Sequence, residues 1–175
     1  MADGKGDLAA RIALIEDRAA IQDLLYAVAS AIDRYDGGVL ARCIDPEAVI
    51  DMGGEAPISG AAFAAAIKPP ANPRPGRMHV ISNSRIRVEG DSAGAESQIV
   101  SWQDQLAGDA RVTRVRAGRY LDRFARTGGE WRLVARTLVD EWARVDPVDA
   151  VPPQGRHLGQ PAPADLLYQT LEGLI

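Results

Sequence analysis

The spacing of apolar residues changes partway along this chain, and the change restricts the folds available to it. In the first part, residues 7–35, apolar side chains recur four, three and four positions apart, the pattern of one face of a helix. This stripe consists of Ile21, Leu25, Val28 and Ile32. From His79 onward the pattern alternates residue by residue, as in a half-buried strand, and glycine-containing turns interrupt it. Four strands are therefore predicted, at residues 78–88, 93–106, 111–126 and 130–143.

The order of these elements predicts the fold class. Helices that precede an uninterrupted run of strands are typical of α+β proteins, in which helices pack on one face of a curved antiparallel sheet. Between the two parts, AVIDM is a candidate strand, and Ser59 is a candidate N-cap for the helix GAAFAAAI. We expect residues 1–146 to form this domain. Residues 147–175 form a proline-rich arm with a short terminal helix, which wraps around the same domain or a neighbour.

Composition and charge exclude several classes of partner. The 175 residues carry a formal net charge of -4 and are 46% hydrophobic, as in ordinary globular domains. Such an acidic chain argues against nucleic acid or an anionic membrane as its main partner. No apolar run has the length of a membrane-spanning helix, and the N-terminus lacks the apolar segment of a signal peptide. The single cysteine, Cys43, fits a reducing compartment, so we expect a cytoplasmic location.

Residues suited to holding a metal ion or a phosphate group are sparse. Of the two histidines, His157 lies far from His79 in the C-terminal arm, and no HxH or CxxC spacing occurs. The glycines of DMGGEA lack the strand–loop–helix context of a nucleotide site. Six arginines fall between residues 111 and 126, but they occupy both strand faces without a ladder of aromatic residues. We expect no metal and no cofactor, and we expect a solvated or interface face for the arginines.

Three segments carry a resemblance to a known family. They are IEDRAAIQDLLYAVASAIDRYDGG, GRMHVISNSRIRVEGDSAGAES and AGRYLDRFARTGGEWRLVARTLVDEW. In this order they resemble the SnoaL-like proteins of the nuclear transport factor 2-like superfamily, over roughly residues 8–146. The resemblance implies a cone-shaped α+β barrel around one cavity. It also implies an activity related to those of scytalone dehydratase, hexachlorocyclohexane dehydrochlorinase and bile acid dehydratase.

The same resemblance implies two catalytic residues. The first-helix aspartate of the related enzymes corresponds to Asp33 in AIDRYD, and the histidine that starts a strand corresponds to His79 in RMHVISN. An imidazole is a competent general base near neutral pH, and a carboxylate on one ring nitrogen fixes its tautomer and stabilises its protonated form. Such a pair suits removal of a C–H proton in an elimination or isomerisation. Other positions depart from the family enzymes, since Val28 and Asp140 stand where relatives carry lysine and arginine.

Two polar residues near this pair are candidates for contacting a substrate. Tyr26 lies two helical turns before Asp33 on the same face, where its phenol could donate to a substrate oxygen. Asn83 lies four residues beyond His79, so a regular strand would place both on one face. Each residue also has a structural explanation. Tyr26 could pack at the edge of the core, and Asn83 could form hydrogen bonds with nearby backbone groups.

Three residues on the predicted strands complete the set of candidates. Trp102 is suited to lining a pocket for a ring, although core packing also explains it. Arg119 and Tyr120 are neighbours on the third strand, so only one of them can face a cavity, and the sequence leaves the choice open. Either could polarise a carbonyl group or hold a leaving group.

These observations favour a lyase or isomerase that acts without a cofactor on a small hydrophobic cyclic or polyketide-like molecule. Two other functions stay open. One is a non-catalytic protein that binds a small ligand in the same cavity. The other is a structural subunit that resembles the small subunit of ring-hydroxylating dioxygenases. The resemblance further implies a homodimer or homotrimer that assembles through a sheet face.

Overall fold

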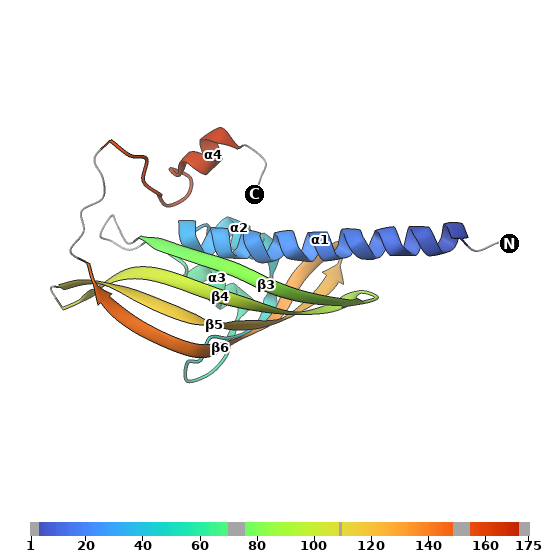
Figure 1. Cartoon of the computed structure of the whole chain (residues 1–175), viewed down its shortest axis with the longest axis horizontal. Helices are drawn as coiled ribbons and strands as arrows, with labels where there is room; N and C mark the ends of the chain where they lie inside the picture. Colours follow the sequence, from blue (N-terminus) through green and yellow to red (C-terminus); the bar gives the residue numbers. More distant parts are fainter. Residues whose placement is uncertain (1–3, 70–75, 109, 149–154, 172–175) are drawn as a thin grey trace.

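A long helix and a curved sheet make up most of the chain (Figure 1). The computed structural model describes residues 4–69, 76–108, 110–148 and 155–171. The helices are α1 (Gly4–Arg34), α2 (Gly37–Cys43), α3 (Gly60–Ala66) and α4 (Leu166–Thr170). The strands are β1 (Ile44–Asp51), β2 (Ile58–Ser59), β3 (Arg77–Glu89), β4 (Ser92–Ala107), β5 (Ala110–Thr127) and β6 (Glu130–Pro147).

The strands form one sheet in the order β2-β1-β6-β5-β4-β3. All neighbours pair antiparallel except β1 and β6, which are parallel. The predicted α+β class is confirmed, and β3 to β6 match the four predicted strands within a few residues. Among the described residues the sheet is open, with β2 and β3 at its ends, and α1 lies along its concave side (Figure 1).

The predicted apolar stripe of α1 forms the centre of the core. Ile21, Leu25 and Val28 are fully buried, and they belong to one cluster with Phe124 of β5 and Leu133 of β6. The start of the next helix follows from its capping residue, because the Asp36 carboxylate accepts from the Val39 backbone N–H at 2.9 Å. The core therefore holds α1 against β5 and β6, and the cap starts α2 shortly after α1 ends.

Two of the register shifts in the sheet change which side chains face the concave side near His79 and Tyr120. The pairing of β3 with β4 shifts between Ser82 and Arg85, where Asn83 has a φ of 48°. The pairing of β5 with β6 shifts at Gly118, so that Glu141 has no partner on β5. A side chain at Gly118 would collide with the Val139 carbonyl oxygen, so this close approach requires glycine.

The concave face changes from apolar to polar along the strands. At one end, Ala95 and Phe124 belong to the buried core, and the partly buried Ile86 packs against it. Towards the start of β3 the paired positions are His79 and Ser101. An apolar core therefore anchors the sheet at one end, and polar groups gather at the other.

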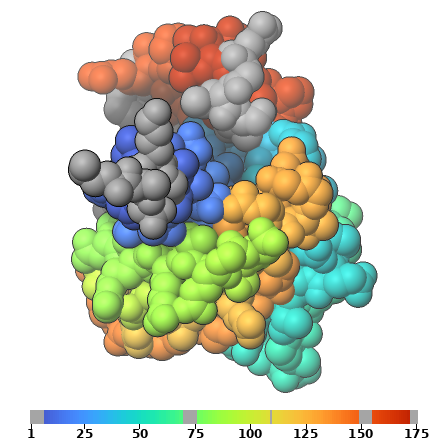
Figure 2. Space-filling model, turned by 90° about the vertical axis from the view of Figure 1, so that its right-hand side faces the viewer, coloured from blue at the N-terminus to red at the C-terminus, as the bar shows by residue number. Residues whose placement is uncertain are grey.

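The C-terminal arm docks on the last turn of α1. The Ala162 backbone N–H donates to the Arg34 carbonyl oxygen at 2.8 Å, and the Arg34 Nε donates to the Asp165 carboxylate at 3.3 Å. The Tyr168 hydroxyl donates to Asp36 at 2.7 Å. Figure 2 shows this arm (red) on the side of α1 (blue) that faces away from β3 (green). Residues 155–171 thus pack on the arm's own domain.

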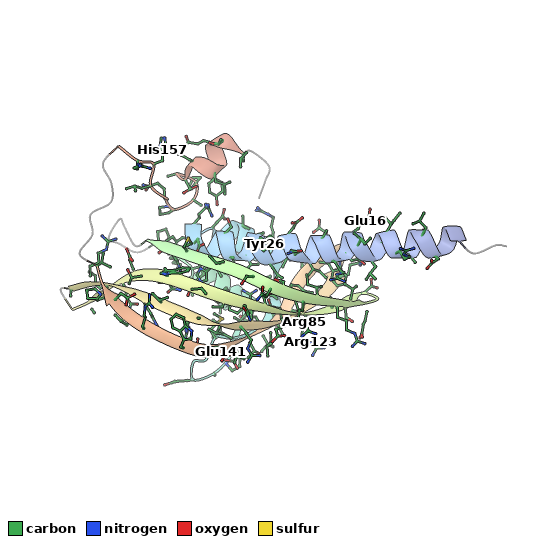
Figure 3. All side chains as sticks on the ribbon, viewed as in Figure 1. Glu16, Tyr26, Arg85, Arg123, Glu141 and His157 are labelled. Atoms are coloured by element: carbon green, nitrogen blue, oxygen red, sulfur yellow. The ribbon has the colours of Figure 1, made fainter. Side chains whose placement is uncertain are left out.

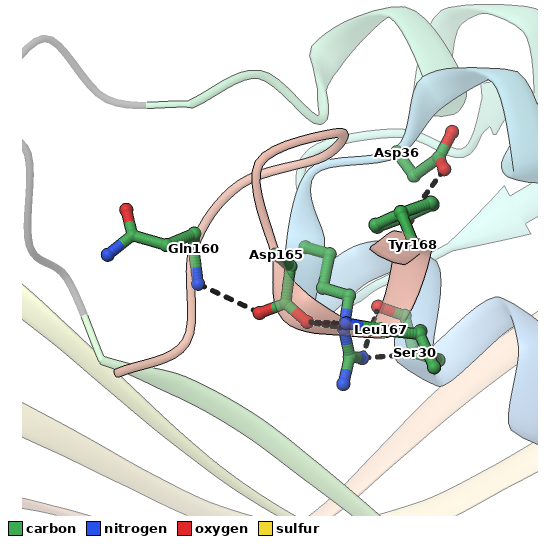
Figure 4. Close-up of polar contacts among 7 residues, drawn as sticks. Ser30, Asp36, Gln160, Asp165, Leu167 and Tyr168 are labelled. Atoms are coloured by element: carbon green, nitrogen blue, oxygen red, sulfur yellow. Dashed lines mark hydrogen bonds and ion pairs between the residues drawn. The ribbon is translucent and has the colours of Figure 1, made fainter. Parts of the chain in front are cut away.

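Asp165 is the polar centre of this docking (Figure 4). Its carboxylate accepts from the backbone N–H groups of Gln160 at 2.9 Å and Leu167 at 3.0 Å. Burial alone would raise the pKa of Asp165, but these two donors and Arg34 hold it below its ordinary value. Burial and the hydrogen bond to Asp36 raise the pKa of Tyr168 to about 12. The docked arm therefore favours an ionised Asp165 and a neutral Tyr168.

Candidate active site

Asp33 and His79 lie in direct contact. Asp33 Oδ1 is 2.6 Å from His79 Nδ1, and Asp33 Oδ2 accepts from the His79 backbone N–H at 2.8 Å. The Asp33 side chain is 14% exposed and the His79 ring 5%. An ionised carboxylate can only accept, so Nδ1 carries the hydrogen in this contact and Nε2 has a free lone pair. Among the described residues Nε2 has no hydrogen-bond partner.

Local structure explains why the two residues meet. Asp33 is one residue from the end of α1, on the helical face beside the edge strand β3. His79 is the third residue of β3, and its side chain points to the concave side with Ile81, towards α1. One carboxylate binds both the ring and the backbone of His79, so it fixes the ring and the start of the strand together.

A basic residue from the middle of the sheet lies on the same row as His79. His79 pairs with Ser101 of β4, and Ser101 pairs with Arg116 of β5, so all three face the concave side. Arg116 is held by Asp140 of β6, with Nε 2.7 Å from Oδ1 and the Nη2 group donating to Oδ2 at 2.7 Å. The expectation of a solvated or interface face for the arginines is therefore wrong for Arg116, because the register across three strands cannot be read from one sequence.

Of the neighbours Arg119 and Tyr120 on β5, Tyr120 faces the concave side. Its side chain is 2% exposed, and the Arg136 guanidinium carbon lies 3.9 Å from the centroid of its ring. Arg136 in turn donates twice to the buried Asp122 carboxylate, at 2.8 Å each. Burial raises the pKa of Tyr120, against the opposing charges of Arg136, Arg116 and Arg77. The phenol is therefore neutral and can donate a hydrogen bond.

Arg119 points the other way. It lies on the convex face, where Nε donates to Glu141 at 2.8 Å and an Nη group donates to Glu96 at 3.1 Å. These exposed carboxylates raise the pKa of the guanidinium. Figure 3 shows Glu141 on the side of the sheet that faces away from α1. On this strand Tyr120 therefore faces the concave side and Arg119 the convex side.

Asn83 and Trp102 also point away from His79. The turn in the backbone at Asn83 moves its side chain to the convex face, where it donates to Gln98 at 2.8 Å. The prediction that Asn83 shares a face with His79 is therefore wrong, because the strand is irregular between them. Trp102 alternates with Ser101 and pairs with Met78, so its ring lies on the convex side as well.

Tyr26 shares a helical face with Asp33 but does not share its surroundings. Its side chain is 44% exposed, and its hydroxyl accepts from the Gln22 side chain at 2.6 Å. The structure therefore gives Tyr26 no contact with the pair. Of the five predicted substrate-contacting residues, Tyr120 alone lies on the face that carries His79.

Other features bear on ligands and partners. Within the described ranges, no group of three histidine, cysteine, aspartate or glutamate side chains is placed to hold a metal ion. No helix in the same ranges is both long and apolar enough to cross a membrane. A pocket of about 660 Å³ lies between α2, α3 and β1, and Ala41, Ile44 and Ala64 help to line it. Neither Asp33 nor His79 lines this pocket.

The fold and the polar end of its concave face define the class of protein. It is an α+β protein with one long helix across a strongly curved sheet, and its fold is similar to that of a solved nuclear transport factor 2-like protein. The profile of the SnoaL-like domain matches residues 13–137, and the chain belongs to that family.

One curated protein and two solved structures illustrate what this chain is similar to. The uncharacterized protein Rv2910c of Mycobacterium tuberculosis is 31% identical over 128 residues, which cover 71% of this chain and 86% of that protein. Hexachlorocyclohexane dehydrochlorinase LinA-type3 from Novosphingobium barchaimii is 20% identical with a TM-score of 0.68, over 82% of this chain and 99% of that one. An NTF2-like protein from Novosphingobium aromaticivorans is 29% identical with a TM-score of 0.63, over 81% and 92% of the two chains.

Proposed function

We propose that this protein is a lyase or isomerase that needs no cofactor, with His79 as the proton-transferring base and Asp33 as its orienting partner. The observation that carries the proposal is the contact of 2.6 Å between Asp33 and His79 Nδ1, which leaves Nε2 without a partner among the described residues. The ring faces the concave side of the sheet, towards α1, and its side chain is 5% exposed.

The proposed reaction has one proton transfer at its centre. His79 Nε2 takes a proton from a substrate C–H group, and the electron pair of that bond forms a new C=C bond. In an elimination, the leaving group departs with its bonding pair, as a halide or as water after protonation by the imidazolium. In an isomerisation, the imidazolium returns the proton to another carbon. Asp33 stabilises the imidazolium, and general-base help of this kind contributes about 10² to 10⁴ in rate.

Other groups on the concave face suit this chemistry. Tyr120 presents a neutral phenol that can donate to a carbonyl or a leaving-group oxygen. Ile81 and Ile99 lie between His79 and Tyr120 and belong to a small apolar cluster with Leu138. This mixture fits a substrate that is mostly apolar and cyclic, with one polarisable oxygen or halogen.

A substrate screen with three variants tests the proposal. Purified protein is incubated with cyclic β-hydroxy ketones, chlorinated cyclohexanes and β,γ-unsaturated cyclic ketones, and products are detected by mass spectrometry and absorbance. We expect turnover without added cofactor, its loss in His79→Gln, and a decrease of about 10² or more in Asp33→Asn. His157→Gln is the matched control, because His157 is exposed on the arm (Figure 3).

Two outcomes would contradict the proposal. Turnover that survives in His79→Gln would remove the histidine from the mechanism. Ligand-dependent stabilisation without any product across the screen would instead favour a non-catalytic binding protein.

A further inference from the structure

Arg77 begins β3 two residues before His79, and its side chain is directed to the same face of the strand. No ion pair and no hydrogen bond of its side chain is found among the described residues. Its Nε is enclosed without an acceptor, and its guanidinium carbon lies 5.2 Å from the centroid of the Tyr35 ring. Enclosed donors without a partner are rare in folded proteins. The side chain as a whole is only partly buried, so its terminal nitrogens remain accessible.

The acidic groups on this face are already committed to other partners. Asp33 binds His79 at 2.6 Å, Asp140 binds Arg116 at 2.7 Å, and Asp122 binds Arg136 at 2.8 Å. The positive charge of Arg77 is therefore not compensated by a carboxylate within 4.0 Å among the described residues. A guanidinium held against a ring, beside an otherwise paired set of charges, is suited to receive an anion from outside the protein.

The separation of Arg77 from the proposed base sets the distance between the ligand group that Arg77 binds and the carbon that reacts. Residues two positions apart on one strand face are separated by about 7 Å. A substrate carboxylate on Arg77 would therefore place a carbon a few bonds away near His79 Nε2. The charges of Arg77 and Arg116 both act to lower the pKa of Tyr120, against the larger effect of its burial.

We propose that Arg77 binds a carboxylate of the substrate, so that the protein prefers small alicyclic or aromatic acids to their neutral counterparts. The inference rests on the proposed function, because it assigns a substrate class to the site of His79. A carboxylate accepts from the guanidinium through two oxygens, which fixes the orientation of the ring that bears it. A neutral analogue leaves these donors unpaired, so the site discriminates against it.

Binding of matched probes tests the inference independently of turnover. The probes are benzoate, cyclohexanecarboxylate and 2-naphthoate, each compared with its carboxamide by isothermal titration calorimetry at fixed ionic strength. We expect at least one carboxylate to bind the wild-type protein tenfold or more tightly than its carboxamide, which corresponds to about 1.4 kcal/mol. Arg77→Gln should remove this preference and leave carboxamide binding unchanged.

The control variant is Arg123→Gln. Arg123 is exposed on the convex face of β5, so this change removes one positive charge without touching the concave side (Figure 3). Its preference for carboxylates should equal that of the wild type, and circular dichroism verifies that both variants are folded. No preference for any of the three carboxylates, or the same loss in both variants, would overturn the inference.

The two proposals fail separately. A carboxylate preference that depends on Arg77 and persists in His79→Gln, in a protein without turnover, would uphold the ligand class and reject the catalytic role. Turnover of neutral substrates that is unaffected by Arg77→Gln would uphold the catalytic role and reject the ligand class.

Discussion

Breaking the ion pair between Asp122 and Arg136 should destabilise the protein strongly. The side chain of Arg136 is 2% exposed and that of Asp122 is 0%, and two hydrogen bonds of 2.8 Å join them. Arg136→Met keeps much of the side-chain volume but leaves a buried carboxylate without its partner. Loss of one partner of a buried pair costs about 3–5 kcal/mol of the free energy of unfolding. For a domain of this size that corresponds to a decrease in Tm of roughly 6–20 °C.

The comparison with a double variant separates the pair from its surroundings. Asp122→Leu combined with Arg136→Met removes both charges, and replacement of a whole buried pair by apolar groups is often close to neutral. We therefore expect the double variant to be more stable than either single variant in urea unfolding monitored by circular dichroism. A loss below about 1 kcal/mol in Arg136→Met, or additive losses in the double variant, would refute the reasoning about desolvation.

Three further results are expected. Because the pKa of Asp165 is lowered in the docked arm, its contribution to docking is present above about pH 4 and disappears as the pH falls through the lowered value, which hydrogen exchange at the Leu167 amide can follow. Gly118→Ala should lower the free energy of unfolding by more than about 1 kcal/mol, measured by urea titration, because the new methyl group meets the Val139 carbonyl oxygen. Trp142 is 49% exposed on the convex face, so Trp142→Glu should reduce the oligomer mass measured by light scattering if that face joins subunits, whereas an unchanged mass would exclude this use of the face.

The sequence predicts the elements better than the faces they present. The stripe of α1 and the alternating strands have strong periods, so helix and sheet could be predicted from local pattern alone. Asn83 was assigned to the face of His79 on the assumption of a regular strand, and one residue with positive φ reverses that assignment. Beyond a single irregular residue, every later side chain of the strand lies on the face opposite to the one that simple alternation predicts.

The basic residues of the site were missed for a different reason. Arg77 and Arg116 are ordinary in sequence, the first at the end of a proline-rich loop and the second within a run of arginines. Their position beside His79 depends on the pairing of β3 with β4 and of β4 with β5, which one sequence does not contain. The resemblance to a family located Asp33 and His79, because in that case two positions in known relatives supplied the missing long-range information.

The docking of the arm on Arg34 has a practical consequence for anyone who expresses this protein. Arg34 directly follows Asp33, and it contributes both its backbone oxygen and its guanidinium to the arm. An affinity tag fused after Ile175 would be attached to the arm that contacts Arg34, and it could disturb the position of the neighbouring Asp33. The first turns of α1, by contrast, extend beyond the sheet (Figure 1). A tag on the N-terminal side is therefore the better choice for activity screens. A comparison of the activities of the two fusions would show whether docking of the arm affects Asp33.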